Sequence, residues 1–438
     1  MKTFRLFPIV LLCSALAPSA RAQSLVDLYE AARPYDATFQ SAQSQYQATL
    51  ARADQSRAGT LPTVNLGMAA SLSAIDSSSK LPNPSFGSTS ATLSASQPLY
   101  RPANWITYEQ GKKSVAVAQA QLQTAEQDLV IRVSQAYFDV LAAQDALTFV
   151  GAQKTAVAEQ LASAKRNFEV GTSTITDTRE AQARFDLVVA QQIAAENDLR
   201  VKKLALDQLV GKSDAAPKTL APPVLLPALV PADVNPWVEQ AIIDHPALRQ
   251  AALALEVAQL ETRKAETGNK PTLDLTGSHS MGRNDGSAAS RVDSRTASTT
   301  VGLAFNLPLF AGYAIQNRIK ETLALEDKAR SDLEAARRSV SQATRAAFFG
   351  VLSGQGQVKA LEAAEASSQS ALDANKLGYQ VGVRINIDVL NAQSQLFQTK
   401  RDLARARYDV LLGSLKLRQA NGSLKAEDLQ AVNSLLVK

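Results

Sequence analysis

The sequence contains a single cysteine, Cys13, and only two histidines, His245 and His279, among 438 residues. Cys13 lies inside an N-terminal segment that we expect to be removed, so the exported chain has no disulfide, no thiolate metal ligand and no cysteine nucleophile. His245 precedes Pro246 near an expected helix start, where we expect a surface or packing role, and His279 falls in an expected strand. No constellation of catalytic or metal-ligating residues is visible, and we expect no metal and no other cofactor.

Glycine patterns that bind phosphate are missing as well. Neither Gly-x-Gly-x-x-Gly nor Gly-x-x-x-x-Gly-Lys-Ser/Thr occurs, and Gly354-Gln-Gly356 lies inside a helical pattern. The sequence therefore argues against a nucleotide-dependent protein and, with no catalytic group in view, against an enzyme.

Aromatic residues are scarce at 5%, although hydrophobic residues reach 45% and alanine is abundant. Such a composition suits helices that pack closely along their whole length better than a large globular core. The net charge of +5 includes Lys2, Arg5 and Arg21, with no acidic residue before Gln23, so the exported chain carries about +2. Without a basic patch interleaved with aromatics, no nucleic-acid partner is expected.

The first 22 residues read as a secretory signal peptide. Lys2 and Arg5 give a basic start, residues 7–16 form a short apolar core, and Ala20-Arg21-Ala22 is a small-x-small cleavage site. The apolar core is too short to span a bilayer. The alternative, an uncleaved N-terminal anchor, is the weaker interpretation.

The remaining chain repeats itself at a separation of about 210 residues, a period that indicates a duplicated structural unit. Five pairs of segments match in the same order: Gly59–Leu66 with Gly268–Leu275, Gln97–Tyr100 with Leu307–Phe310, Ala136–Leu141 with Ala347–Leu352, Phe168–Gly171 with Tyr379–Gly382, and Ala181–Gln182 with Ala392–Gln393.

Six prolines between the matching halves predict an extended, non-helical linker, after which Asn235-Pro236 is predicted to cap the next helix. The predicted organisation is a signal peptide over 1–22, a first structural repeat over 23–212, a proline-rich linker over 213–236, a second repeat over 237–422 and a C-terminal tail over 423–438.

Each repeat is predicted to run helix, two strands, long helix, break, helix. The predicted helices are 24–58, 101–169 and 177–210 in the first repeat, and 236–267, 312–380 and 388–421 in the second. A helix over 101–169 would be about 100 Å long, and the two shorter helices placed end to end would match it. The simple arrangement is a long rod of paired helices.

Apolar residues along the first long helix follow alternating three- and four-residue steps, interrupted by Glu126 and Lys154, which is coiled-coil spacing. An amphipathic helix in an ordinary bundle is the alternative. The seam consists of Leu122, Leu129, Val133, Ala136, Val140, Ala143, Leu147, Val150, Val157, Leu161, Ala164 and Phe168.

Two stretches of strict alternation separate the first and second helix of each repeat. Residues 63–72 place apolar side chains at even positions and small or polar ones at odd positions, and 91–99, 272–276 and 301–309 alternate in the same way. This pattern is typical of outer-membrane strands, although a half-buried soluble sheet would alternate too. The segments 76–86 and 284–296 are expected to be surface loops. Aromatic residues that would suit a membrane interface follow the strands: Tyr100, Trp105, Phe310 and Tyr313.

Four strands cannot close into a barrel, yet a spanning sheet must close because lipid cannot pair backbone groups. Two chains would give eight strands, which side chains fill, whereas three give twelve and leave an open lumen. If the protein is a conduit, the predicted fold is a mixed α+β membrane protein. Four strands per chain would contribute to a trimeric 12-stranded transmembrane β-barrel, which a long α-helical coiled-coil barrel continues.

Over essentially the whole exported chain, the sequence resembles the TolC family of outer-membrane efflux and secretion channels. The most specific segments are Tyr379–Ala392, Ala406–Asp409 and Leu424–Leu429. The resemblance implies a homotrimer in the outer-membrane lipid of a Gram-negative bacterium, with an α-helical barrel that crosses the periplasm. It also implies a periplasmic adaptor and an inner-membrane transporter of the ABC or RND type as partners.

The resemblance further implies a gate at the periplasmic tip, where the helices break at Gly171 and Gly382 and an adaptor would dock. The implied gating residues are Thr176, Asp177, Tyr379, Arg384, Asp388 and Asn391.

Tyr379 and Arg384 could hydrogen-bond to Asp177 and tie neighbouring coils together. Repeated around an axis, Asp388 would form a ring that attracts cations. The family often has a second carboxylate where this chain has Asn391, so a second acidic ring is in doubt. Thr176 and Asp177 could also simply begin a helix.

Three classes of protein remain: an export conduit, a soluble periplasmic coiled-coil scaffold and a secreted enzyme. The scaffold would leave four alternating strands without a role, and the enzyme lacks site chemistry. The conduit is therefore the favoured interpretation, as the exit duct of a type I secretion or multidrug efflux system. The sequence does not identify its cargo.

Overall fold

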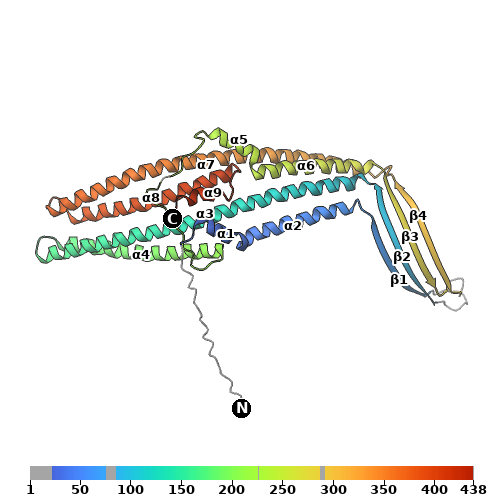
Figure 1. The fold of residues 1–438 in the computed structure, drawn as a ribbon, viewed down its shortest axis with the longest axis horizontal. Coiled ribbons are helices and arrows are strands. Elements are labelled where there is room, and N and C mark those ends of the chain that lie inside the picture. The colour runs from blue at the N-terminus through green and yellow to red at the C-terminus, as the bar shows by residue number, and fades with distance from the viewer. Residues whose placement is uncertain (1–21, 75–84, 225, 287–291, 438) are drawn as a thin grey trace, which may run out of the picture.

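The computed structural model describes residues 22–74, 85–224, 226–286 and 292–437. Most of the predicted signal peptide, residues 76–84 of the first predicted loop and residues 287–291 of the second lie outside these residues. The loop predictions were wrong at residues 85–86, 284 and 294–296, which belong to strands. The molecule is a long bundle of helices with a sheet at one end (Figure 1). In the part of the chain that is described, no helix combines the length and apolar character needed to cross a membrane.

The two halves of the chain have the same order of elements. The first half contains α1 (Leu25–Tyr35), α2 (Ala37–Ala58), β1 (Thr63–Ala74), β2 (Ser85–Tyr100), α3 (Pro102–Glu169) and α4 (Ile175–Val210). The second half contains α5 (Val234–Asp244), α6 (Pro246–Glu266), a 3₁₀ turn η1 (Thr267–Asn269), β3 (Thr272–Asn284), β4 (Ser294–Asn306), α7 (Ala314–Gln380) and α8 (Asn386–Ala420), and the short α9 (Asp428–Asn433) follows.

Each predicted first helix is in fact two helices, so the ranges 24–58 and 236–267 were wrong as single helices. Asp36 leaves the helical conformation and caps α2 by accepting from the Phe39 amide. His245 leaves it because the following proline disfavours helical backbone at that residue, and its ring accepts from the Ala247 amide.

Further boundaries differ from the prediction, and α4, α7 and α8 each begin two residues from the expected position. Asp233, rather than Asn235, caps α5, so Asn235 and Pro236 lie inside the first turn. β4 ends at Asn306 and not at residue 309. The C-terminal tail contains α9, and Leu436 pairs with Leu220 of the linker, so part of the tail is ordered against the rod.

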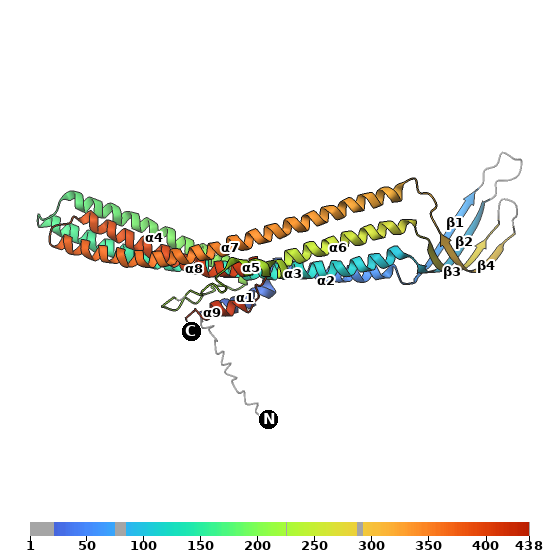
Figure 2. The same cartoon turned by 90° about the horizontal axis from the view of Figure 1, so that it is seen from above.

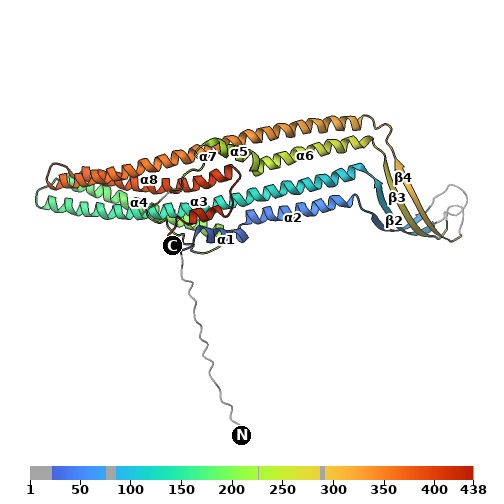
Figure 3. The same ribbon diagram turned by 45° about the horizontal axis from the view of Figure 1, so that its top comes forward.

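The helices form a curved layer four helices wide. Near the sheet the order across the layer is α2, α3, α6, α7 (Figure 3), and farther away it is α4, α3, α8, α7 (Figure 1). The long helices α3 and α7 run the whole length, and the short helices stack end to end beside them, as the helix lengths predicted. α3 therefore has helical neighbours on both sides, whereas α7 forms one edge of the layer.

The coiled-coil seam of α3 is largely buried, which confirms the predicted contact face. Leu129, Val133, Val140 and Val157 are fully or almost fully buried, whereas Phe168 at the end of the seam is exposed. The largest buried cluster lies at mid-length, where α1 packs against α3 and α9 packs against α1 (Figure 2).

The four strands form one antiparallel sheet in the order β1-β2-β3-β4. Val64 pairs with Ala95, Ala95 with Gly277 and Gly277 with Val301. These four residues form one row that crosses all four strands. Cross-strand partners share a face, and this register therefore fixes which side chains stand together on each face.

Candidate functional site

One face of the sheet carries small, mostly hydroxyl-bearing side chains. The register places Asn65, Ser94, Ser278 and Thr300 in one row, and the rows on either side have the same character. Ser71 and Ser88 are joined by a hydroxyl hydrogen bond of 2.7 Å. Asp274 is the acidic residue on this face among the described strands, and it lies at the end next to the helices. The face suits contact with water.

The opposite face carries the apolar residues, and most of them are exposed. Large exposed side chains on this face include Val64, Leu66, Met68, Leu72, Leu93, Leu275, Met281, Val301, Leu303 and Phe305. A sheet that exposes aliphatic side chains on one face and hydroxyls on the other suits lipid on the first side and water on the second.

Exposed aromatic residues lie where the sheet joins the helices, as the sequence predicted for an interface belt. Tyr100, Trp105, Phe310 and Tyr313 are all exposed, and the rings of Phe310 and Tyr313 meet edge to face at 5.5 Å. Amphipathic rings favour the boundary between an apolar phase and water.

A bidentate ion pair fixes the sheet to the helices. Arg101, directly before α3, donates from Nε (2.8 Å) and Nη2 (2.5 Å) to the two carboxylate oxygens of Asp274 in β3. Because the fork matches the carboxylate, the pair sets the angle between α3 and the sheet as well as their distance.

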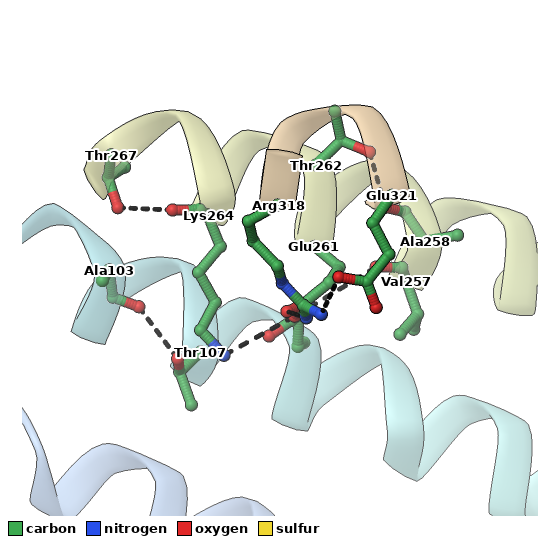
Figure 4. A network of polar contacts seen from close by, with 11 residues as sticks. Ala103, Thr107, Val257, Ala258, Glu261, Thr262, Lys264, Thr267, Arg318 and Glu321 are labelled. Carbon is green, nitrogen blue, oxygen red and sulfur yellow. Dashed lines mark hydrogen bonds and ion pairs between the residues drawn. The ribbon is translucent and has the colours of Figure 1, made fainter. Parts of the chain in front are cut away.

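A second polar network joins α6 to its neighbours α3 and α7, close to the end of α6 that leads into the sheet (Figure 4). Glu261 of α6 accepts from Gln110 of α3 at 2.9 Å and from Arg318 of α7 at 2.7 Å, and Lys264 lies 3.5 Å away. The Gln110 amide and then the Arg318 guanidinium hold the pKa of Glu261 below its ordinary value, despite partial burial. One carboxylate thus joins three helices of the layer.

The far end of the molecule consists of two helical turns built alike. Gly171 follows α3 with φ +75°, and Gly382 follows α7 with φ +82°, the left-handed region that favours glycine. The Gly171 amide donates to Phe168, and the Gly382 amide donates to Tyr379. The sequence therefore located both turns correctly.

These turns expose apolar side chains to an unusual degree. Val170 and Ile175 flank the first glycine, and Val381, Val383 and Ile385 surround the second, and all five are exposed. Exposed branched side chains at the end of a rod suit a contact surface.

Asp177 forms a capping box at the start of α4. Its carboxylate accepts from the Thr174 amide at 3.1 Å, and its own amide donates to Thr174 Oγ1 at 3.2 Å. Thr176 lies in the same first turn. The Ser173 hydroxyl and the Thr174 amide hold the pKa of Asp177 below its ordinary value. The capping alternative raised from the sequence is thus present in the structure.

Within one chain, the two predicted partners of Asp177 have other contacts. Tyr379 Oη accepts from Asn167 Nδ2 of α3 at 3.1 Å. Arg384 lies just before α8, and its Nη1 is 3.6 Å from Asp388 Oδ2 in the first turn of that helix. A tie from Tyr379 or Arg384 to Asp177 of a neighbouring chain stays a prediction.

Sequence reasoning missed the contacts that join the two pairs of helices near this end. Gln160 of α3 donates to Asn386 Oδ1 at 2.5 Å, and Asn386 donates to the Asp177 carbonyl at 3.3 Å. Arg184 of α4 donates to Asn391 of α8 at 2.8 Å. The partners are more than 200 residues apart in the chain, and no local pattern announces them.

Comparison with known proteins places this geometry in a known family. The family described as "Outer membrane efflux protein" matches residues 28–212 and 237–423. The chain is 33% identical to the outer membrane protein TolC of Vibrio cholerae over 420 residues, which covers 96% of this chain and 95% of that protein.

Two further similarities extend the comparison. The chain is 29% identical to the alkaline protease secretion protein AprF of Pseudomonas aeruginosa, over 95% of this chain and 88% of that protein. The crystal structure of the CmeC outer membrane channel of Campylobacter jejuni superposes with a TM-score of 0.79, over 94% of this chain and 90% of that one, at 15% identity. The latter likeness concerns the fold.

Proposed function

The chain belongs to the outer membrane efflux protein family, and from this premise we propose that three copies form the gated exit duct of a tripartite export machine. That the protein is an outer-membrane channel of the efflux and secretion type, and not an enzyme, follows from its relatives. The predicted family and mixed α+β fold are confirmed. The assembly, the partners and the gate are the proposed part.

The observation that carries the proposal is a two-faced sheet whose outer strands are β1 and β4. Apolar residues on one face of this sheet are exposed, so lipid can cover them, and hydroxyls on the other can line water. In lipid an open edge leaves backbone groups unpaired, so β1 of one copy must pair with β4 of the next. Three copies supply twelve strands and leave an open lumen.

The helical layer supports closure of the same kind. α7 lies at one edge of the layer and exposes Phe349 and Leu352. We place these side chains against the α2 and α4 edge of the neighbouring copy, which would cover them. Pairing of both edges would then continue the barrel into a closed helical tunnel.

The relatives act as parts of export systems. We propose the other two parts, an adaptor and a transporter, from the place of the exposed turns in this molecule. The exposed apolar turns around Gly171 and Gly382 form the end farthest from the sheet, so they would meet a periplasmic adaptor. An inner-membrane transporter of the ABC or RND type would then supply cargo. Both protease secretion and drug efflux fit a passive duct.

For the gate, we propose that Thr176, Asp177, Tyr379, Arg384 and Asp388 hold the far end closed when three copies meet there. Arg384 and Asp388 are solvent-accessible and lie beside the turn of the second helical pair. In a ring of three, each Arg384 can leave its own Asp388 and reach Asp177 of the next copy.

Single-channel recording in planar bilayers tests the duct and its gate together. Arg384→Ser should raise the conductance, because ties between copies are lost, and Asp388→Ala should weaken block by divalent cations. Arg405→Ser and Asp409→Ala are matched controls, since this pair has the same i,i+4 spacing on α8 at 3.9 Å.

The outcomes separate the parts of the proposal. A purified protein that is monomeric in detergent, or that inserts without forming channels, contradicts the duct. Channels whose conductance is the same with Arg384→Ser as with Arg405→Ser contradict the gate alone.

A further inference from the structure

Two arginines lie side by side on the apolar face of the sheet, at the end farthest from the helices. Ala70 pairs with Thr89, Thr89 with Arg283 and Arg283 with Arg295, so both arginines belong to one row of this face. Both are exposed, and among the described strands no other permanently charged side chain lies on this face. Like charges directly opposite each other destabilise a sheet, so an anion at this row would stabilise it.

Nearby carboxylates neutralise one of the two arginines. Asp285 Oδ1 lies 3.1 Å from Arg283 Nε, and Asp293 Oδ2 lies 3.6 Å from Arg283 Nη2. Within the part of the chain that the structure describes, Arg295 forms no ion pair. Arg295 is therefore the cation of this row that can hold an added anion.

The arginine row lies at the level of lipid headgroups. A tilted strand needs about 9–11 residues to cross the hydrocarbon core, which matches β3 from Leu273 to Arg283. An arginine on a lipid-facing surface is costly at the centre of the bilayer and costs little at its boundary. The helices extend into the periplasm from the opposite end of the sheet, so the arginine row lies at the outer leaflet.

The next row on the same face, nearer the helices, is apolar. It holds both methionines of the chain other than Met1. Met68 pairs with Ala91, Ala91 with Met281 and Met281 with Ala297. The methionine side chains are 76% and 57% exposed, so they are free to contact lipid. Flexible thioether side chains adapt to an irregular apolar partner, and an acyl chain is such a partner.

A cavity joins the two rows. Its volume is about 750 Å³, and it is lined by residues of the arginine row, the methionine row and the row between them. This volume lies in the range of sites that bind small molecules. The small residues Ala70, Ala91 and Ala297 leave room between the long methionine and arginine side chains. The cavity therefore offers apolar walls with a cation at the outer end.

We propose that this cavity binds a phosphorylated lipid of the outer leaflet, with the phosphate on Arg295 and an acyl chain against Met68 and Met281. The planar guanidinium suits phosphate, because it can donate two parallel hydrogen bonds to the oxygens. Asp285 and Asp293 repel a phosphate from the Arg283 side, which favours Arg295 as its partner. The inference rests on the proposed function in one respect, since the apolar face must turn to lipid.

The test measures the affinity of the full-length protein in detergent for diphosphorylated lipid A by native mass spectrometry, with lipid A stripped of phosphate as the comparison. The wild type should bind the phosphorylated form about tenfold more tightly, as expected for hydrogen bonds to a charged group. Arg295→Ala should remove most of this selectivity. Arg295→Lys should retain part of it, because the charge remains without the planar fork.

The acyl contact is tested separately. Met68→Ser combined with Met281→Ser should weaken the binding of both lipids by about three- to tenfold and leave the selectivity for phosphate unchanged, because only apolar contact is lost. Arg345→Ala is the control, since Arg345 is an exposed arginine of α7 outside the sheet, and it should bind as the wild type does. Elution at the wild-type oligomer size verifies each variant, and Arg295→Gln replaces Arg295→Ala if the latter fails.

Equal affinity of the wild type for the two lipids, or wild-type selectivity in Arg295→Ala, overturns the site. Displacement of lipid A by millimolar inorganic phosphate would mean that Arg295 holds a free anion, and the assignment to lipid would be wrong. The binding measurement needs no ion flow, so it is independent of channel recording. Wild-type channels without lipid selectivity leave the duct intact, whereas lipid selectivity in a protein that forms no channels contradicts the duct alone.

Discussion

The segments Ala136–Leu141 of α3 and Ala347–Leu352 of α7 have closely similar sequences but lie in different environments. Phe138 and Leu141 are 2% and 1% exposed, whereas their counterparts Phe349 and Leu352 are 54% and 51% exposed. The positions directly before them, Tyr137 and Val140 in α3 and Phe348 and Val351 in α7, are buried in both segments. Half of the same motif is thus core in one repeat and surface in the other.

The position of each long helix explains the difference. α3 has helices on both sides, and Phe138 stacks on Tyr408 of α8 with ring centres 5.8 Å apart. α7 lies at the edge of the layer, and Phe349 has an edge-to-face contact with its own neighbour Phe348. A bulky apolar side chain at an exposed edge fits the proposed interface between copies, in which another surface would cover it.

Alanine substitution at the two phenylalanines tests this explanation and has the largest expected effect. Phe138→Ala should lower the free energy of unfolding by about 3–5 kcal/mol, the range for a buried aromatic that leaves a cavity. Phe349→Ala should change the unfolding of one chain little but weaken the proposed trimer. Urea unfolding in detergent measures the first effect, and size-exclusion chromatography with light scattering measures the second.

Leu352→Ala provides a second variant at the edge and should behave as Phe349→Ala does. A loss of chain stability in Phe349→Ala as large as in Phe138→Ala would show that α7 is covered within its own chain. That result would remove the edge from the proposed interface.

The two repeats also place a glycine against the break in their first helix. Gly211 ends α4 with φ +70°, and a Cβ there would lie 2.5–2.8 Å from the exposed Tyr35 ring. Gly422 follows α8 with φ +78°, and a Cβ there would lie 2.5 Å from the His245 Cα and 2.8 Å from its amide nitrogen. An added Cβ would therefore clash with a rotatable side chain at Gly211 and with backbone at Gly422.

Gly422→Ala should therefore cost more than Gly211→Ala. We expect about 2–4 kcal/mol for Gly422→Ala, because the backbone at the α5–α6 break must shift, and about 1–2 kcal/mol for Gly211→Ala from the left-handed conformation. Urea unfolding midpoints of the two variants give the comparison. Equal losses of unfolding free energy in the two variants would mean that the backbone at the α5–α6 break shifts at no greater cost than rotation of the Tyr35 ring.

The sequence predicted the long helices closely, because strong local signals mark their ends. The helix expected over 101–169 is observed as Pro102–Glu169, where proline begins it and the turn before Gly171 ends it. The strands followed from strict alternation, and their pairing confirms the two faces.

The breaks at Asp36 and His245 were missed, because a single non-helical residue separates two helices in each case. At His245 the following proline was a local signal that the prediction did not use. The exposed edge of α7 was also invisible, since the same residues are buried in α3. For the candidate site, the glycine turns were local and therefore predictable. The Arg184–Asn391 contact depends on how two distant helices pack, and no sequence period encodes it.

The contributions of Asp36 and His245, the residues at the two helix breaks, to folding stability should depend differently on pH. This is the smallest of the expected effects. Arg132 donates to both oxygens of Asp36 at 2.8 and 2.9 Å, and this pairing holds the pKa of Asp36 below its ordinary value of 3.8. Burial lowers the pKa of His245 below its ordinary value of 6.5. Both groups contribute stability above their ordinary pKa and lose it as pH falls toward the lowered value.

Of these two groups, therefore, only His245 should weaken the fold between pH 7.5 and pH 5.5, because the unfolded chain takes up a proton there that the folded chain does not bind. His245→Asn retains a good capping residue and should abolish this part of the pH dependence. Asp36→Asn should cost about 1–2 kcal/mol at both pH values, since Asp36 is ionised at both and loses its pairing with Arg132. Unfolding curves at the two pH values measure each change. If His245→Asn retains the wild-type difference between them, the pH sensitivity arises elsewhere, and the two breaks differ in sequence but not in response to protons.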